Sequence, residues 1–336
     1  MNFRLLGAAL ALFAAAAVAS AQAPAPAAAP ATPLRVIAFD GGWNLPVWAA
    51  QRQGFFQANG VAVQLAFTPT SAALVTGLYD GRYDIAIATI DNFIAYQEGQ
   101  GEAKLSGDPD FVVVMGGDGG FLSVVGGPGI KSFAELKGKT LSVDAMSTGL
   151  AFVLRELVAR AGVPEADVKY VRAGGTAQRY ADITAGKHDA TLLRTPFELL
   201  AQERGLAILG TAESLGAYQG SVAAVRRGWA KQNEAALVGF LRGYRQGVAW
   251  AYDPANREVA EALLVAHNRD MTPALARRSY DLLLAAKGGL AKDGALEVEG
   301  IRTVLALRSK YGVPQKTLTD PAKYVDESYL RAAAAR

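Results

Sequence analysis

Apolar residues along this chain fall into short runs, and most runs are followed by a polar loop and then by apolar positions at helical spacing. Residues 34–40, 61–67 and 83–88 are short and β-prone, which predicts three strands. Residues 47–60 and the segment after Thr70 have the spacing of helices. Strands that alternate with helices predict right-handed βαβ units and a mostly parallel sheet.

The same alternation returns further along the chain. Residues 111–120, 121–125, 140–143, 168–172 and 189–193 are predicted strands, and polar or glycine-rich loops lead from several of them into helices. The sequence therefore predicts an α/β protein built from two similar halves. In such sheets ligands bind beyond the carboxyl ends of the strands, which is where these loops lie.

The clearest strand, loop and helix unit spans residues 140–163, and its loop is residues 144–149. Ser147 and Thr148 are natural N-cap residues, and Gly149 allows close approach to the first amides of the helix. Such a helix start favours an anion or a strong hydrogen-bond acceptor. An ordinary capped helix explains the same residues, so both interpretations stay open.

The last third of the chain changes character. Residues 221–226 predict one more strand, and from Trp229 onward the pattern is almost entirely helical. Residues 233–252 and 273–287 have clear amphipathic spacing, and prolines mark the breaks between helices. These helices carry no catalytic pattern, and we expect them to cover the first half of the fold.

The N-terminus has the pattern of an export signal. Arg4 precedes an apolar run at 5–19, and Ala19, Ser20 and Ala21 form a small-residue cleavage site. We therefore predict a signal peptide at 1–21, followed by a flexible Pro/Ala linker at 22–33. The chain has no cysteine, so the predicted cleavage site offers none for lipid attachment, and we expect an unlipidated periplasmic protein.

Composition and motifs exclude several classes of function. The net charge of +3 is small and its basic residues are dispersed, which argues against a nucleic-acid partner. The glycine-rich segment at 116–129 has no nucleotide-binding spacing, and its first glycines are followed by the predicted strand 121–125 where a helix would be required. HExxH and GxSxG are absent, and His188 and His267 are predicted at the surface. We expect no catalytic residues, no metal site and no cofactor.

Several segments, in their order and spacing, resemble the periplasmic solute-binding proteins of ABC importers. They are LRVIAFDGGWNLPVWAAQRQGFFQANGVAVQL, GRYDIAIA, IKSFAELKGKTLSVDAMSTG, GKHDATLLRTPFE and YGVPQKTLTDPAKYVDESYL. The branch is the one that serves nitrate, taurine, aliphatic sulfonates and thiamine pyrimidine precursors. The resemblance implies the type II two-lobed fold, with two mixed, mostly parallel sheets, flanking helices and a two-crossover hinge. Lobe 1 would be 34–122 plus 221–336, and lobe 2 would be 123–220.

The resemblance also implies a function and partners. A small-molecule solute would be held between the lobes, and the loaded, monomeric protein would dock on the transmembrane subunits of an ABC permease. A module that presents its solute to a sensor kinase uses the same chemistry and stays open. A yeast-type pyrimidine synthase resembles this branch as well, but it depends on a cysteine-rich motif that this chain lacks.

Residue-by-residue carry-over places the solute among loops of both lobes. The resemblance implies contacts from Trp43, Asn44, Thr70, Ser71, Asp91, Asn92, Ser147, Thr148, Gly149, Thr176, Arg194 and Tyr218, with Gly175 and Gln219 beside them. Trp43 is either a stacking wall or a buried indole of the lobe. Thr70 and Asp91 are equally explained as helix caps.

Arg194 is the sharpest candidate in this set. A guanidinium there could hold a carboxylate or sulfonate through charged hydrogen bonds of about 1.5–3 kcal/mol each. The alternative is a surface arginine paired with Glu198 or Asp189. Asp91 would repel an anion and attract an amine, so an amine or pyrimidine solute remains open beside the favoured carboxylate or sulfonate.

Overall fold

The computed structural model describes residues 31–335 of the 336-residue chain. The predicted signal peptide, 1–21, and most of the predicted linker, 22–33, lie outside the described residues. The first strand begins at Thr32, so the last two residues of the predicted linker belong to a strand. Within residues 31–335, no helix is both long and apolar enough to cross a membrane.

The first sheet has five strands in the order β2-β1-β3-β10-β4. They are β1 (Thr32–Ala38), β2 (Val61–Phe67), β3 (Ile85–Thr89), β4 (Phe111–Gly116) and β10 (Ser221–Arg226). β1 pairs in parallel with β2 and β3, whereas β10 runs antiparallel to both β3 and β4. The sheet is therefore mixed but mostly parallel, as the alternation of strands and helices predicts.

The second sheet repeats this plan with the order β7-β6-β8-β5-β9. Its strands are β5 (Leu122–Gly126), β6 (Lys139–Val143), β7 (Val168–Arg172), β8 (Ala190–Arg194) and β9 (Ile208–Thr211). Here β5 is the antiparallel strand, paired with β8 and β9. The edge strand β9 is absent from the sequence prediction, because its four residues, ILGT, are too few for a periodic pattern.

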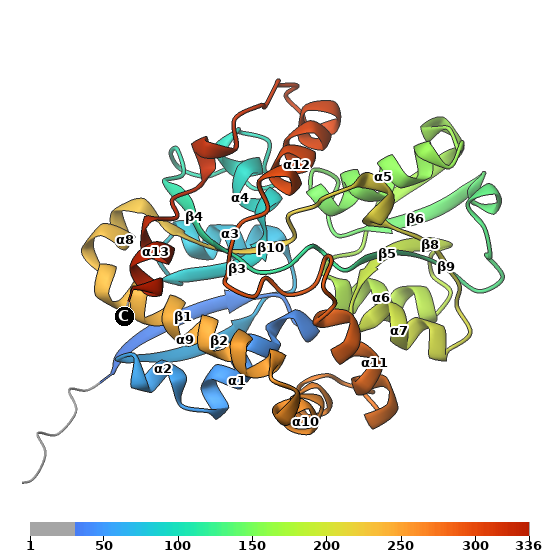
Figure 1. The fold of residues 1–336 in the computed structure, drawn as a ribbon. Coiled ribbons are helices and arrows are strands. Elements are labelled where there is room, and N and C mark those ends of the chain that lie inside the picture. The colour runs from blue at the N-terminus through green and yellow to red at the C-terminus, as the bar shows by residue number, and fades with distance from the viewer. Residues whose placement is uncertain (1–30, 336) are drawn as a thin grey trace, which may run out of the picture. The chain divides into compact units, whose positions relative to one another are not determined.

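Helices flank both sheets (Figure 1). The first part of the chain contributes α1 (Leu45–Arg52), α2 (Phe55–Ala58), α3 (Ser71–Tyr79), α4 (Ile90–Gln97), α5 (Gly149–Arg160), α6 (Thr176–Thr184) and α7 (Phe197–Glu203). The last part contributes α8 (Arg227–Gln232), α9 (Glu234–Tyr252), α10 (Arg257–His267), α11 (Pro273–Leu283), α12 (Val298–Tyr311) and α13 (Ser328–Ala334). Short 3₁₀ turns lie at Gly42–Asn44, Phe133–Leu136, Glu165–Asp167, Ala212–Leu215, Pro254–Asn256 and Pro321–Tyr324.

Local sequence explains several of these boundaries. The turn at Phe133–Leu136 starts with the capping box that Ser132 and Glu135 predict. Thr70 caps α3 by accepting a hydrogen bond from the backbone of Ala73 at 3.2 Å. Pro273 stands in the first turn of α11, where its missing N–H costs nothing, and Thr272 caps that helix.

We call the first sheet with its helices lobe 1, and the second sheet with its helices lobe 2. Two features connect them beyond the covalent crossovers between the sheets. α12 packs against α5 of lobe 2, and α11 packs against α7 (Figure 1). The C-terminal helices therefore do more than cover lobe 1, because two of them contact lobe 2 directly.

Candidate functional site

Three segments run side by side where the lobes meet. Residues 117–121 connect β4 to β5, residues 216–220 lead back into β10, and residues 284–297 connect α11 to α12. The Ala291 N–H donates to the Gly117 carbonyl at 2.8 Å, and the Glu297 N–H donates to the Gln219 side chain at 2.7 Å. The two predicted crossovers are therefore joined by a third segment that is hydrogen-bonded to both of them.

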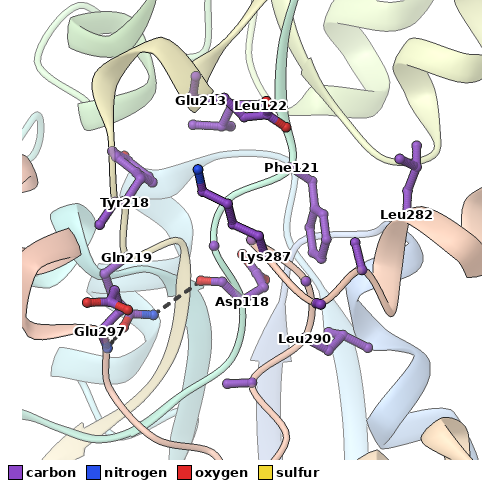
Figure 2. Close-up of a pocket in the computed structure, with 18 of the residues that line it drawn as sticks. Asp118, Phe121, Leu122, Glu213, Tyr218, Gln219, Leu282, Lys287, Leu290 and Glu297 are labelled. Atoms are coloured by element: carbon purple, nitrogen blue, oxygen red, sulfur yellow. Dashed lines mark hydrogen bonds between the residues drawn. The ribbon is translucent and has the colours of Figure 1, made fainter.

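A cavity of about 580 Å³ lies among these segments, which we call the hinge cavity. Its size is ordinary for a small-molecule site. Figure 2 shows Phe121, Leu122 and Tyr218 around it, with the Lys287 side chain extending into it from the third segment. The Asp118 side chain, also in its wall, connects the cavity to buried charges between the lobes.

Arg194, at the end of β8, is one of those buried charges and is only 3% exposed. Its Nη2 donates to both Asp118 carboxylate oxygens at 2.9 Å and to the Ser221 hydroxyl at 3.1 Å. Its Nε donates to the Gly120 carbonyl at 2.8 Å. The alternative in which Arg194 lies at the surface with Glu198 or Asp189 is therefore wrong, because the partner is Asp118.

Trp43 and Asn44 lie in the turn before α1 and are both buried. The Arg194 guanidinium carbon lies 4.0 Å from the centroid of the Trp43 ring, which is a cation–π contact. The Asn44 amide donates to the carbonyls of Phe39 and Gly41, but its Oδ1 is buried without a hydrogen-bond partner. Asn44 thus has one acceptor without a hydrogen-bond partner. The Trp43 ring packs against the Arg194 guanidinium, so it is not a free stacking surface for a solute.

Asp91, in the first turn of α4, is 1% exposed and links the two lobes. Its Oδ1 accepts from Arg308 Nε at 2.6 Å, and its Oδ2 accepts from Arg308 Nη2 at 2.7 Å. The same Oδ2 accepts from the Gly149 N–H, at the start of α5, at 2.5 Å. A Cβ at position 149 would overlap the Asp91 carboxyl, so this approach requires glycine.

The remaining predicted residues at the start of α5 also have partners inside the protein. The Ser147 backbone and hydroxyl both donate to Glu102 at 3.2 Å. The Thr148 hydroxyl donates to Asp144 at 2.5 Å and forms no cap hydrogen bond. The sequence predicts that this helix start binds an anion or a strong acceptor. In this structure the acceptor at the helix start is the carboxylate of Asp91.

Four other predicted residues have local structural contacts. Thr70 is the cap of α3, as its alternative interpretation expects. Asn92 donates to the carbonyl and hydroxyl of Thr89 at 3.3 and 2.9 Å. Thr176 accepts from Arg179 at 3.4 Å, whereas Ser71 is buried at the start of α3.

Tyr218 is the predicted residue that lines the hinge cavity. It is 4% exposed, and its hydroxyl is buried without a hydrogen-bond partner. Burial raises the pKa of this phenol well above its usual range, and the negative charge of Asp91 adds to the rise while Arg194 opposes it. The phenol is therefore neutral, and its hydroxyl is available to donate or accept one hydrogen bond.

Four residues of this buried cluster escape sequence reasoning: Asp118, Asp144, Arg179 and Arg308. Arg179 is 1% exposed and donates to the carbonyls of Gly174 and Leu192 at 2.7 and 3.0 Å from its Nη1 and Nη2. Its charge opposes the rise in the pKa of Asp144 that burial causes. The sequence offers a signal for one of them. Arg308 lies on the apolar face of α12, and an arginine at such a position indicates a buried charge with a partner.

Comparison with known proteins identifies the family. The family model described as "NMT1/THI5 like" matches residues 44–257, which is more than half of the chain. The chain belongs to the NMT1/THI5-like family. No curated protein sequence matches this member of the family.

Solved structures similar to this family member have the same fold at low sequence identity. SsuA from Xanthomonas axonopodis pv. citri, an alkanesulfonate-binding protein bound to MOPS, has a TM-score of 0.69 at 16% identity and covers 91% of this chain and 99% of its own. The periplasmic nitrate-binding protein NrtA from Synechocystis PCC 6803 has a TM-score of 0.72 at 14% identity. The match covers 90% of this chain and 88% of NrtA. The ligand-binding component of an ABC-type import system from Staphylococcus aureus, solved with zinc bound, has a TM-score of 0.71 at 13% identity. The match covers 90% of this chain and 99% of the Staphylococcus aureus protein.

These likenesses establish the two-lobed fold of periplasmic binding proteins for this chain, as the sequence predicts. They do not identify the solute, which has to be inferred from the residues of the site. Within residues 31–335, no group of three or more histidine, aspartate and glutamate side chains is placed so that it could hold a metal ion.

Proposed function

We propose that this protein is the extracytoplasmic solute-binding component of an ABC importer. It captures a small polar solute between its lobes and delivers it to the permease from the periplasm. The observation that supports this function most is the set of buried polar side chains between two α/β lobes, with Arg194 stacked on Trp43 and with polar atoms of Tyr218 and Asn44 that have no hydrogen-bond partner.

The cluster has hydrogen-bonding capacity that its own side chains leave unused. The Tyr218 hydroxyl and the Asn44 Oδ1 are buried without partners, and a buried unsatisfied polar group costs about 1–3 kcal/mol. Bound solute would supply the missing partners, and opening of the lobes would supply water. Closure therefore becomes favourable when solute is present, because a ligand shifts an equilibrium by its differential affinity for the two states.

The chemistry of the cluster supports binding rather than catalysis. Arg194 is held by Asp118 and Trp43, and burial raises the pKa of Tyr218, so neither side chain readily gives up a proton. The similar structures are those of an alkanesulfonate-binding protein, a nitrate-binding protein and the ligand-binding component of an ABC-type import system, which is consistent with this proposal.

The test is a thermal-shift screen of residues 22–336 against taurine, glycine, cytosine, methanesulfonate, benzoate, nitrate and ethylamine. Solute at a hundredfold excess over its dissociation constant should stabilise the protein by about 2.7 kcal/mol. If none of these solutes raises the melting temperature, and larger polar solutes give the same result, the proposal is contradicted.

Tyr218→Phe is the matched variant, because it removes one hydroxyl and leaves the ring. Without solute its melting temperature should stay the same or rise, since an unpartnered buried hydroxyl is lost. Its affinity for the solute should fall about threefold to tenfold, which corresponds to one hydrogen bond. Unchanged affinity in isothermal titration would place the solute away from Tyr218.

A further inference from the structure

The buried guanidiniums between the lobes are matched by buried carboxyl groups. The guanidiniums are those of Arg179, Arg194 and Arg308, and three carboxylates lie among them, those of Asp91, Asp118 and Asp144. A further buried carboxyl, that of Glu198, lines the hinge cavity. A charge buried without compensation is strongly destabilising, so this balance constrains which solutes the lobes can enclose.

Asp91 occupies the position that the sequence assigns to an anionic ligand. Its carboxylate accepts the Gly149 N–H at the start of the twelve-residue helix α5, at 2.5 Å. Arg308, which is 0% exposed, donates to the same carboxylate at 2.6 and 2.7 Å. We call the α5 start and Arg308 together the anion seat. A helix start and a guanidinium are the groups that bind carboxylates and sulfonates in proteins.

We propose that Asp91 is a built-in counter-anion that sets the charge class of the solute: it fills the anion seat, so the interlobe site takes a solute without net charge, uncharged or zwitterionic, and discriminates against organic anions. The solute part of this inference rests on the proposed function, whereas the filled seat stands on the geometry alone.

The other buried guanidiniums do not restore an anion site. Arg194 directs its Nε and Nη2 to Gly120, Asp118 and Ser221. Arg179 donates to backbone carbonyls beside Asp144, which is also buried. An anion added beside Tyr218 would therefore meet cations that already have counter-charges, together with three carboxylates that repel it.

The unused groups of the cluster fit a neutral partner. The Tyr218 hydroxyl and the Asn44 Oδ1 are uncharged, and they pair with the amide, hydroxyl or amino groups of a solute. The cationic side chain that extends into the hinge cavity, Lys287, is exposed and keeps its own hydration.

Emptying the seat by mutation tests the first step. Asp91→Ala leaves Arg308 and the Gly149 N–H without their carboxylate, so the melting temperature should fall by roughly 5–15 °C. Formate, acetate or nitrate at millimolar concentration should enter the seat and recover a large part of that loss. Asp91→Gly, which also vacates the space of the carboxylate, is the second variant if the alanine variant does not fold, and it should be rescued by formate in the same way.

Two controls separate rescue from general salt effects. The double variant Asp91→Ala with Arg308→Met removes the cation of the seat and should show no recovery with formate beyond that of the wild type. Asp80→Ala breaks the exposed pair with Arg82, whose atoms lie 3.4 Å apart, and should change little with or without formate. Equal effects of formate on all four proteins would overturn the filled anion seat.

The solute part is tested by isothermal titration with taurine, glycine and cytosine as net-neutral probes, and with methanesulfonate and benzoate as anions. The wild type should bind a net-neutral probe at least tenfold more tightly than either anion, and Asp91→Asn should narrow that ratio by improving anion binding. Tighter anion binding by the wild type would overturn the charge class while supporting solute capture. If no probe binds but formate rescues Asp91→Ala, the result would count against solute capture and would still support the filled anion seat.

Discussion

Arg194 and Arg308 show how single residues hold the lobes together. Arg194 of lobe 2 pairs with Asp118, which is 76 residues away in sequence. Arg308 pairs with Asp91, 217 residues away but in the same lobe, and its Nη2 donates to the Ser147 carbonyl of lobe 2 at 2.8 Å. The sequence marks Arg194 as unusual because it ends a predicted strand before a proline. It cannot identify Asp118 as the partner, because that pairing depends on how the second sheet docks against the crossover.

Glu198, in the first turn of α7, gives a prediction on pH. Burial raises its pKa to about 7, although the Thr195 hydroxyl at 2.6 Å and the charge of Arg194 oppose the rise. A carboxyl whose pKa is raised by folding contributes stability below its unfolded value, about 4.5, and that contribution is lost as the pH rises through about 7.

Glu198→Gln should remove this pH dependence. Between pH 5 and pH 8 the wild type should lose up to about 3 kcal/mol that the variant retains. Urea unfolding of both proteins at the two pH values measures the difference. Parallel pH profiles for the two proteins would show that Glu198 is ionised at low cost and that its burial has no such effect.

At the scale of elements, the seam between α5 and α12 is built from charged contacts. Glu156 of α5 accepts from Lys310 Nζ at 2.7 Å and from the Tyr311 hydroxyl at 2.8 Å. The Arg155 guanidinium lies 4.4 Å from the centroid of the Tyr311 ring. The same seam includes the hydrogen bonds from the Gly149 N–H to Asp91 and from Arg308 to the Ser147 carbonyl, and all of these contacts join α5 and the loop before it to lobe 1.

Acid should therefore open the seam. Burial tends to raise the pKa of Glu156, but hydrogen bonds from Lys310, Arg160 and Tyr311 outweigh it and lower the pKa to about 2. A carboxylate with a lowered pKa contributes stability above its unfolded value, and this contribution is lost as the pH falls from about 4.5 to about 2.

Glu156→Gln should make the thermal stability less sensitive to pH in that range. Its melting temperature should be lower than that of the wild type near pH 6, and the two should converge toward pH 3, as measured by circular dichroism. An unchanged gap between the two proteins at pH 3 would mean that packing, and not charge, holds the seam.

Elements were far more predictable than the contacts between them. Sequence pattern predicts strands at 61–67, 168–172 and 221–226 with the same bounds as β2, β7 and β10, because the half-exposed edge strands β2 and β7 alternate apolar and polar residues and the central strand β10 is almost entirely apolar. The helix start at Thr70 was found from its cap. The site was only partly predictable. Several candidates, such as Thr70 and Asn92, have local partners, whereas the partners of Asp91 and Gly149 depend on how the two lobes dock.

At the scale of the whole molecule, the lobes touch through their loops as well as their helices. The Gly175 N–H of lobe 2 donates to the Pro69 carbonyl of lobe 1 at 3.0 Å, on the side where α3 and α6 begin. In this arrangement the Tyr218 hydroxyl and the Asn44 Oδ1 remain without partners. The cost of these two groups favours opening in the absence of solute, whereas the ion pairs favour closure.

The distance between the lobes in solution tests solute capture most directly. The chain has no cysteine, so Ala58→Cys in lobe 1 and Ala166→Cys in lobe 2, both exposed positions, can carry spin labels without further changes. With the panel solute that gives the largest thermal shift, the distance distribution should narrow and move to a single closed population, and Tyr218→Phe should need more solute for the same change. A distribution that stays the same at saturating solute would contradict capture between the lobes.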